Sequence, residues 1–319
     1  MPAGCVIGVD LGGTKLLAGA VDERLDVHHR AHRLAPSTDR AAVLDAIVET
    51  VEAARAGAGG EVRAVGMGIP SLMDQAAGVA VTTVHLPIRD VPFQAVMAER
   101  LGLPVFVDND ANCAMLAEHR FGAARGARHA LMLTIGTGIG GGIVVDGRLV
   151  RGALGSAGEL GHMVVDMDGP PCQGSCPNRG CLEAVASGSA LGRDGAAAAA
   201  GAPDSALGRA LAEGRPMTGA LVTELAHDGD EVAVGVVRRV GWALGVGIAS
   251  LVNIFNPEVV VVGGGVIAAG DLLLEPAREV VATRALSPSR DLVRIVPARF
   301  GAESGMLGAA ALALDGLQP

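Results

Sequence analysis

Short apolar runs that end in glycine recur along the chain and give the first expectations about its fold. Residues 5–10 form an apolar run that ends in a Gly-Gly turn, and residues 16–21 resume the apolar pattern, which predicts a β-hairpin. Residues 130–135, a glycine turn over 136–142 and a strand over 143–145 repeat this arrangement. Two copies of one motif predict two related α/β lobes in the chain.

Apolar residues at helical spacing predict the elements between and after these hairpins. A helix over residues 40–57 is followed by a strand over 63–69, and a strand over 105–107 leads into a helix that ends near Arg120. The same reasoning predicts a helix end at residues 196–201, a loop over 204–219 and a long helix over 237–254. A buried strand over 259–262 leads into a glycine turn at 263–265, and a final helix spans 305–314.

Composition adds constraints on the class of protein. Hydrophobic residues make up 50% of the 319 residues but aromatic residues only 2%, so aliphatic side chains must build the cores of both lobes. A formal net charge of -9 argues against a nucleic-acid-binding surface. We find no uninterrupted apolar stretch of about 18 residues and no charged-then-apolar leader, so we expect a cytoplasmic protein without a membrane span.

The glycine turns are candidate anion sites. Consecutive glycines let backbone N–H groups approach an anion closely, and three such turns follow strands in this chain. Each turn alone is equally compatible with a tight hairpin. Around the first turn, Asp10 offers a carboxylate for hydrated Mg²⁺, and Thr14 and Lys15 offer donors to phosphate. The spacing differs from that of a P-loop.

Asp108, Asn109 and Asp110 stand where a strand passes into a helix. A carboxylate at this position can project into a cleft and accept the proton of a hydroxyl group. The same three residues could instead cap the helix. From the residues alone, both interpretations stay open.

A third group of residues has the composition of a metal site. Four ligands of the types that tetrahedral Zn²⁺ prefers fall within twenty residues, namely His162, Cys172, Cys176 and Cys181. The alternative is a surface loop with free thiols, which would be prone to oxidation. We expect the remaining cysteines, Cys5 and Cys113, to be buried thiols.

Taken together, these motifs resemble a known family. Residues 10–15, 134–142 and 262–265 are similar to the two phosphate turns and the adenosine turn of the sugar kinase, hsp70 and actin superfamily. Within that superfamily the chain resembles the ROK family of bacterial sugar kinases and repressors, because residues 158–162 (Gly-Glu-Leu-Gly-His) precede the cysteine cluster and Gly-Cys-Leu-Glu at 180–183.

The resemblance implies a two-lobed actin-like ATPase fold, with a ribonuclease H-like mixed sheet and flanking helices in each lobe. It divides the chain into a small domain, residues 1–112 completed by a helix over 301–319, and a large domain, residues 113–300, with a zinc loop at 162–183. It also implies an assembly of two or four identical subunits.

The resemblance further implies an ATP-dependent kinase that phosphorylates the 6-hydroxyl group of a hexose, glucose above all, with Asp110 as the general base. The implied sugar-binding residues are Gly68, Ser71, His85, Asn109, Asp110, Glu159, His162 and Glu183. The implied nucleotide-binding residues are Asp10, Gly12, Gly13, Thr14, Lys15, Thr137, Gly138, Gly264 and Gly265. The implied cofactors are ATP, Mg²⁺ and a structural Zn²⁺ that orients Glu159 and Glu183.

Several positions depart from the family pattern. Three residues rather than one separate Cys172 from Cys176, Ser71 replaces a glycine, and His85 and Ile88 stand where many ROK glucokinases carry Asn and Trp. Fructose, mannose, allose and N-acetylmannosamine therefore stay open as acceptors, and polyphosphate as donor. A sugar sensor without catalysis is the alternative from another class, although the first strand begins about five residues into the chain, which leaves no room for the N-terminal DNA-binding domain of a ROK repressor.

Overall fold

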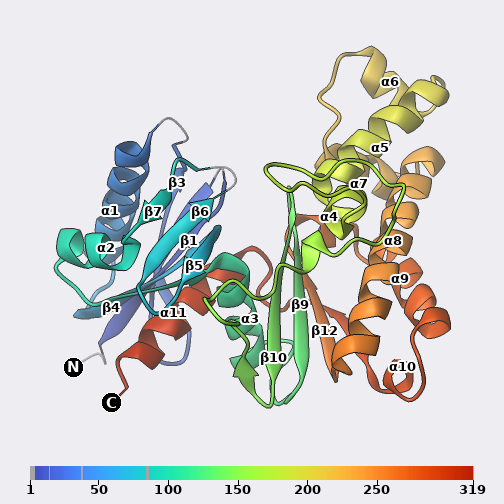
Figure 1. Ribbon diagram of the computed structural model, residues 1–319. Helices are drawn as coiled ribbons and strands as arrows, with labels where there is room; N and C mark the ends of the chain where they lie inside the picture. Colours follow the sequence, from blue (N-terminus) through green and yellow to red (C-terminus); the bar gives the residue numbers. More distant parts are fainter. Residues whose placement is uncertain (1–3, 14, 37–38, 84–85, 319) are drawn as a thin grey trace. The chain divides into compact units, whose positions relative to one another are not determined.

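The computed structural model describes residues 4–13, 15–36, 39–83 and 86–318, and the chain forms two compact units. Unit 1 comprises Met1–Gly126, Gly142–Gly158 and Ala302–Pro319. Unit 2 comprises Ala127–Gly141 and Glu159–Gly301. The domain boundaries implied by the family resemblance, at residues 112 and 300, differ from those of these units and remain a prediction. We describe each unit by itself (Figure 1).

Unit 1 is built on a five-stranded sheet with the strand order β3-β2-β1-β4-β8. β1 (Cys5–Leu11) and β2 (Lys15–Val21) form the predicted antiparallel hairpin, and β3 (Val27–Leu34) continues it at the edge. β4 (Val62–Ile69) and β8 (Val105–Asn109) run parallel to β1. The sheet is therefore mixed, as the family resemblance implies.

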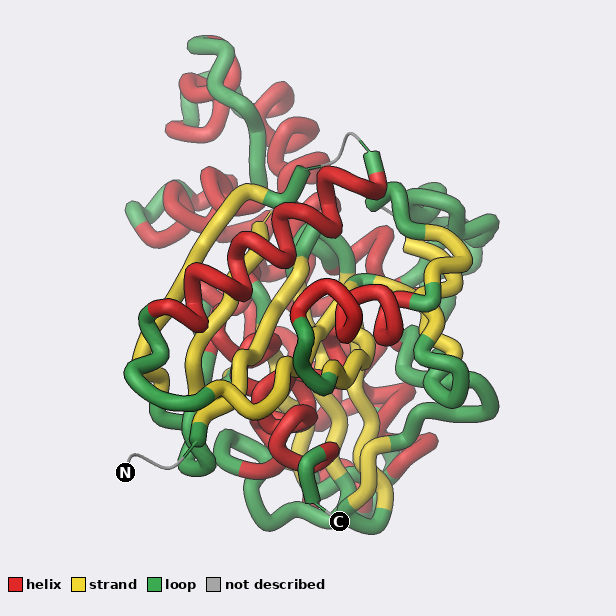
Figure 2. The backbone as a smooth tube through the Cα atoms, turned by 90° about the vertical axis from the view of Figure 1, so that its left-hand side faces the viewer, coloured by secondary structure: helices red, strands yellow, loops and turns green. Residues whose placement is uncertain are grey.

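Helices cover both faces of this sheet (Figure 2). α1 (Arg40–Ala56) and α2 (Phe93–Leu101) pack on one face, and α3 (Asp110–Arg120) and α11 (Ser304–Gly316) pack on the other. Apart from Phe93, the largest fully buried side chains are aliphatic residues and methionines. Both free thiols of unit 1, Cys5 and Cys113, are buried as predicted.

α11 lies unusually close to its neighbours, because glycines remove the side chains that would hold it away. A Cβ atom at Gly66 of β4 would stand 1.8 Å from the carbonyl oxygen of Ala309 in α11. A Cβ atom at Gly308 of α11 would stand 1.6 Å from the carbonyl oxygen of Cys113 in α3. α11 thus contacts the sheet and α3 backbone to backbone, and any larger residue at these positions would displace it.

A small antiparallel sheet in unit 1 was not predicted. It consists of β5 (Ser71–Asp74), β6 (Val79–Thr83) and β7 (Arg89–Val91). Its strands are short, and their apolar positions are interrupted by polar residues, so the sequence pattern gives little signal.

The second five-stranded sheet has the order β11-β10-β9-β12-β13. β9 (Ala130–Ile135), β12 (Val259–Gly263) and β13 (Arg294–Pro297) run parallel, and β10 (Ile139–Val145) and β11 (Arg148–Leu149) complete it. The predicted turn over 136–142 was too long, because three of its glycines lie in β10. Gly142 is needed there for packing, since its Cβ would stand 2.4 Å from that of Met115.

The helices of unit 2 gather around α8 (Glu231–Phe255), which begins six residues before the predicted start. They are α4 (Leu182–Ala186), α5 (Gly188–Gly201), α7 (Gly219–His227), α9 (Asp271–Arg284) and α10 (Ser289–Leu292). By length and composition alone α8 could cross a membrane, but 56% of its apolar segment is buried within the protein. Packing in the core of unit 2 therefore accounts for its apolar character.

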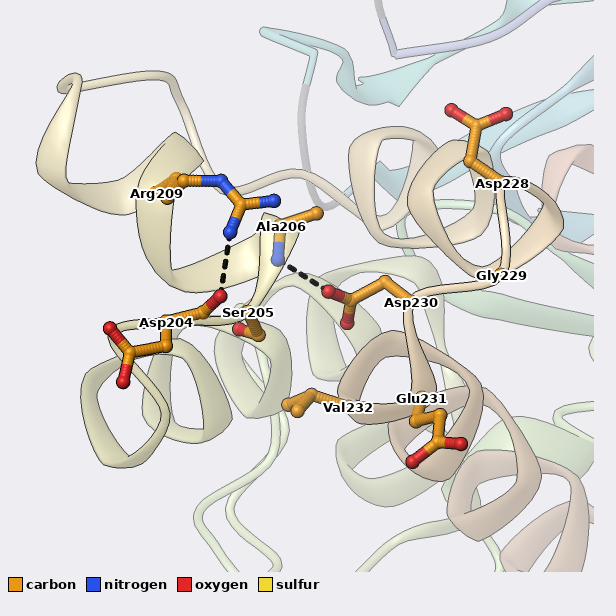
Figure 3. Close-up of a pocket in the computed structure, with 9 residues that line it drawn as sticks. All are labelled: Asp204, Ser205, Ala206, Arg209, Asp228, Gly229, Asp230, Glu231 and Val232. Atoms are coloured by element: carbon orange, nitrogen blue, oxygen red, sulfur yellow. Dashed lines mark hydrogen bonds between the residues drawn. The ribbon is translucent and has the colours of Figure 1, made fainter.

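The segment predicted as a loop after residue 204 contains a further helix, α6 (Ala206–Ala212). Asp230 stabilises its first turn, because one carboxylate oxygen accepts a hydrogen bond from the backbone N–H of Ala206. The other oxygen accepts from Ala233 at 2.8 Å and so caps α8. The surrounding pocket, about 470 Å³, is lined by Asp204, Ser205, Ala206, Arg209, Asp228, Gly229, Asp230, Glu231 and Val232 (Figure 3). It contains none of the predicted site residues.

Replacing Asp230 with Ala should lower the free energy of unfolding of unit 2 by about 1–2 kcal/mol, because one substitution removes an N-cap from α8 and an acceptor from α6. Urea unfolding can be followed by the fluorescence of Trp242, which lies in α8 itself. Glu231→Ala, an exposed change one residue further on, is the matched control. Equal loss of stability in the two variants would contradict the double-capping role.

Candidate functional site

Asp108, Asn109 and Asp110 have three different environments in unit 1. The side-chain oxygen of Asn109 accepts hydrogen bonds from the N–H groups of Ala111 and Asn112, at 2.9 and 3.2 Å. Asn109 is therefore the cap of α3, and the cap interpretation holds for this one residue. Asp108 is fully buried, whereas Asp110, the first residue of α3, stays partly exposed. Of the two carboxylates, Asp110 is the one that solvent can reach.

Asp108 forms an ion pair in which its own carboxylate is buried and its partner is partly exposed. Its carboxylate accepts a hydrogen bond from Nε of Arg151 at 2.7 Å and from the side-chain amide of Asn112 at 3.0 Å. The Arg151 side chain is 34% exposed and that of Asp108 is 0% exposed. The pair thus fixes the end of β8, directly before the two predicted site residues that follow it.

Asp10 lies in the same part of unit 1. The parallel registers pair Asp10 of β1 with Gly68 of β4, and Gly68 with Asp108 of β8. Asp10 also lies against the first turn of α11, since a Cβ atom at Gly305 would stand 2.6 Å from its carboxyl carbon. Burial, and secondly the charge of Asp110, raise the pKa of Asp10 to about 7. A divalent cation would relieve this repulsion, so the residues fit the expected Mg²⁺.

The other predicted residues of unit 1 have more ordinary surroundings. The N–H of Gly12 donates to the carbonyl of Lys15 at 2.8 Å and closes the hairpin, with Gly13 in the turn. The hydroxyl of Ser71 donates to the carbonyl of Thr82 at 2.9 Å within the small sheet, and Ile88 is buried in the core. Thr14 and His85 lie outside the described residues. A sugar contact by the Ser71 side chain stays a prediction.

In unit 2, the predicted phosphate turn and the predicted adenosine turn lie beside each other. β9 and β12 are parallel neighbours, with Gly263 opposite Thr134, and each turn follows its strand. Gly264 has a positive φ of 83°, and its Cβ would stand 2.4 Å from the carbonyl oxygen of Ile135. At Gly265, a Cβ atom would have open space around it among the described residues beyond its chain neighbours and its own helix backbone. Open backbone beside a glycine turn fits a bound nucleotide.

The four predicted metal ligands are brought together. Their ligand atoms all lie within 4.8 Å of one another, from His162, Cys172, Cys176 and Cys181. The Cys172 sulfur is 3.5 Å from Nδ1 of His162, and the other two sulfurs are 3.9 Å apart. Ligands around a tetrahedral zinc ion are about 3.4–3.8 Å apart. The cluster therefore fits a zinc ion despite the long spacing between its first two cysteines.

Glu159 and Glu183 stand beside this cluster. Oε2 of Glu159 is 3.8 Å from Nε2 of His162, the ring nitrogen opposite the one that faces Cys172. Oε1 of Glu183 is 3.7 Å from the Cys172 sulfur. Burial is the main cause that raises the pKa of Glu159 and of the Cys172 and Cys181 thiols. Because a metal binds thiolates, its binding would release protons here.

Three residues with contacts to the predicted site were missed from the sequence. Arg151 pairs with Asp108, while Gln173 and Ser189 both donate hydrogen bonds to the carbonyl of Thr137. Gln173 directly follows a predicted metal ligand, and this neighbourhood could have drawn attention to it. The sequence gives no comparable signal for Arg151 or Ser189.

The chain is similar to known proteins over almost its whole length. Residues 6–316 match the sequence pattern of the ROK family. A glucokinase of Streptomyces coelicolor is 37% identical over 98% of this chain and 98% of its own length. The crystal structure of a ROK family glucokinase from Streptomyces griseus, in complex with glucose and AMPPNP, is 37% identical, covers 98% of this chain and 100% of that one, and has a TM-score of 0.88. A xylose repressor of Caldicellulosiruptor bescii is 29% identical over 98% of this chain and 78% of its own length. The predicted actin-like ATPase fold is thereby confirmed.

Arg151→Met should lower the free energy of unfolding of unit 1 by about 3 kcal/mol, because it leaves the buried Asp108 carboxylate without its cation. Urea unfolding followed by circular dichroism measures this loss, since the single tryptophan, Trp242, lies in unit 2. Arg148→Met, an exposed change in the neighbouring strand, is the control. Adding Asp108→Asn to Arg151→Met should recover part of the loss, and a further drop would argue against the ion pair.

Asp10 should make stability depend on pH in magnesium-free buffer. Its folded pKa of about 7 lies above its ordinary value of 3.8, so the folded protein binds more protons than the unfolded chain between these values. Raising the pH from about 4 to 7 should therefore destabilise the parent relative to Asp10→Asn, by up to about 1.4 kcal/mol per pH unit. The difference in unfolding free energy between the two proteins measures the effect, with Asp90→Asn as an exposed control. A difference that stays constant over this range would exclude the raised pKa.

Proposed function

The chain belongs to the ROK family, and on this premise we propose that it is an ATP-dependent hexose kinase that phosphorylates the 6-hydroxyl group of glucose. The observation that carries the proposal is the similarity, over almost the whole chain, to a ROK glucokinase crystallised with glucose and AMPPNP. We also propose that the enzyme is cytoplasmic and forms a homodimer or a homotetramer.

We propose Asp110 as the general base. A sugar hydroxyl is a weak nucleophile, and a carboxylate within hydrogen-bond reach accepts its proton as the phosphoryl group is transferred. Asp110 suits this role because it is partly exposed, whereas Asp108 is fully buried in its ion pair with Arg151. Asn109, held by its capping bonds, is proposed to contact the sugar together with the backbone near Gly68.

The donor nucleotide is proposed to bind through the glycine turns. Asp10, Gly12, Gly13, Thr14 and Lys15 provide the first turn, with Asp10 as the carboxylate for hydrated Mg²⁺. The second and third turns provide Thr137, Gly138, Gly264 and Gly265. Bound magnesium supplies positive charge for the phosphate oxygens. The open backbone at Gly265 supports this assignment.

Zinc is proposed to act by orientation. His162, Cys172, Cys176 and Cys181 would hold it, and the ion would supply a rigid crosslink within the loop over residues 162–183. The two nitrogens of His162 can then serve separate roles, with Nδ1 facing the cluster and Nε2 facing Glu159. Glu159, His162 and Glu183 are proposed to form hydrogen bonds with hydroxyl groups of the sugar.

Similarity to xylose repressors keeps a sugar sensor without catalysis as the second candidate. Asp110→Asn separates the two functions. In a kinase, sugar-dependent ADP release should fall about 10²- to 10⁴-fold, because the general base is lost while Asn109 still caps α3. Asp90→Asn, the same chemical change at an exposed position of unit 1, should keep parental activity. A sensor would show no difference between Asp110→Asn and the parent.

A second assay addresses the acceptor and the donor. ADP release with ATP, and product formation with ATP or polyphosphate, should be measured on glucose, fructose, mannose, allose and N-acetylmannosamine. We expect the highest kcat/KM with glucose and ATP. A higher value for another sugar would keep the kinase proposal and correct the acceptor.

A further inference from the structure

The turn that is proposed to bind phosphate, residues 136–138, is hydrogen-bonded to the loop that carries the metal ligands, residues 162–183, which we call the metal loop. The side-chain amide nitrogen of Gln173 donates to the carbonyl of Thr137 at 3.2 Å. It also lies 3.2 Å from the hydroxyl of Ser187, which caps α5. Gln173 directly follows Cys172, so the position of this amide depends on how the metal loop is folded.

The same turn is held from α5. The hydroxyl of Ser189 donates to the carbonyl of Thr137 at 2.9 Å, and the N–H of Gly188 donates to the carbonyl of Gly136 at 2.8 Å. The Thr137 carbonyl therefore accepts from two side chains, one on a helix and one on the metal loop. With its carbonyl held on this side, the peptide plane after Thr137 has a fixed orientation, and so does the N–H of Gly138.

A second link joins the loop to the far end of the turn. Oε2 of Glu183 accepts a hydrogen bond from the N–H of Ile139 at 2.8 Å, and Glu183 follows the metal ligand Cys181 by two residues. A Cβ atom at Gly138 would stand 2.2 Å from this oxygen, so the carboxylate packs directly against the turn. The metal loop thus contacts residues 137–139 at two places, near its middle through Gln173 and at its C-terminal end through Glu183.

We infer that Gln173 is a positioning residue that transmits occupancy of the metal cluster to the phosphate turn, so that loss of the metal weakens nucleotide binding as well as sugar binding. The inference rests on the proposed function. In this inference Gln173 does not itself touch the nucleotide; it fixes the Thr137 carbonyl and through it the N–H of Gly138, a donor available to a phosphate. The long spacing between Cys172 and Cys176, which departs from the family pattern, includes this residue.

The test measures nucleotide binding directly, by calorimetric titration of the magnesium complex of AMPPNP into the zinc-loaded protein without sugar. Gln173→Ala should raise the Kd by about 3- to 10-fold, the effect of one lost hydrogen bond. Gln173→Glu, which keeps the shape but places an acceptor against the Thr137 carbonyl, should raise it at least as much. Ser175→Ala, an exposed change in the same loop, is the control and should bind as the parent does.

A cycle with the metal separates transmission from a general effect on structure. Removing zinc with a chelator should weaken AMPPNP binding in the parent, and clearly less in Gln173→Ala, where one of the two links is already absent. Zinc content of the variant, measured by atomic absorption, should equal that of the parent. An unchanged Kd in both Gln173 variants, equal effects of chelation in parent and variant, or reduced zinc content in the variants would overturn the inference.

The outcomes also distinguish this inference from the proposed function. A parent protein that binds no AMPPNP contradicts the kinase proposal and the inference with it. A parent that binds AMPPNP and phosphorylates sugar, beside Gln173 variants that bind equally well, contradicts the inference alone.

Discussion

The backbone contact between α11 and α3 is the constraint on which the arrangement of unit 1 depends. Gly308 places α11 against the carbonyl of Cys113, and Gly66 places the same helix against β4. This fixes α3, and therefore Asp110 at its first position, relative to the strand end that carries Asp10. The carboxylates of Asp10 and Asp110 repel each other, but they stay close because the β-sheet and α3 are both packed tightly against α11.

In unit 2, polar contacts rather than glycine packing hold the predicted site residues in place. A glycine turn offers N–H groups to an anion only if its peptide planes are held, and glycine itself provides no such restraint. Here the restraint comes from Ser189 and Gln173, which share the Thr137 carbonyl, and from Glu183, which holds Ile139. The metal loop and the turn are thereby parts of one hydrogen-bonded network, although 36 residues separate Gln173 from Thr137.

Structural features that are determined by residues close together in the sequence were predicted correctly. The first hairpin, α1, β9 and β12 follow from apolar runs and glycine turns, and the metal cluster from ligand types and spacing. The small sheet, α6 and the early start of β10 were missed, because short strands, a helix stabilised by the distant Asp230, and strand glycines leave no local pattern. The separate roles of Asp108, Asn109 and Asp110 required the structure, since the cation that pairs with the buried Asp108 is 43 residues away in the sequence.

The place of α11 in unit 1 has a consequence for biosynthesis. Its residues, Ser304–Gly316, come last among the elements of the chain, yet they complete the sheet and helix packing of a unit whose first strand begins at Cys5. During translation the faces of β1, β4 and α3 that α11 covers stay exposed until this helix has been made. All of unit 2 is synthesised between α3 and α11. The nascent chain therefore carries an uncovered apolar surface until α11 has left the ribosome, and chaperones can bind this surface in the meantime.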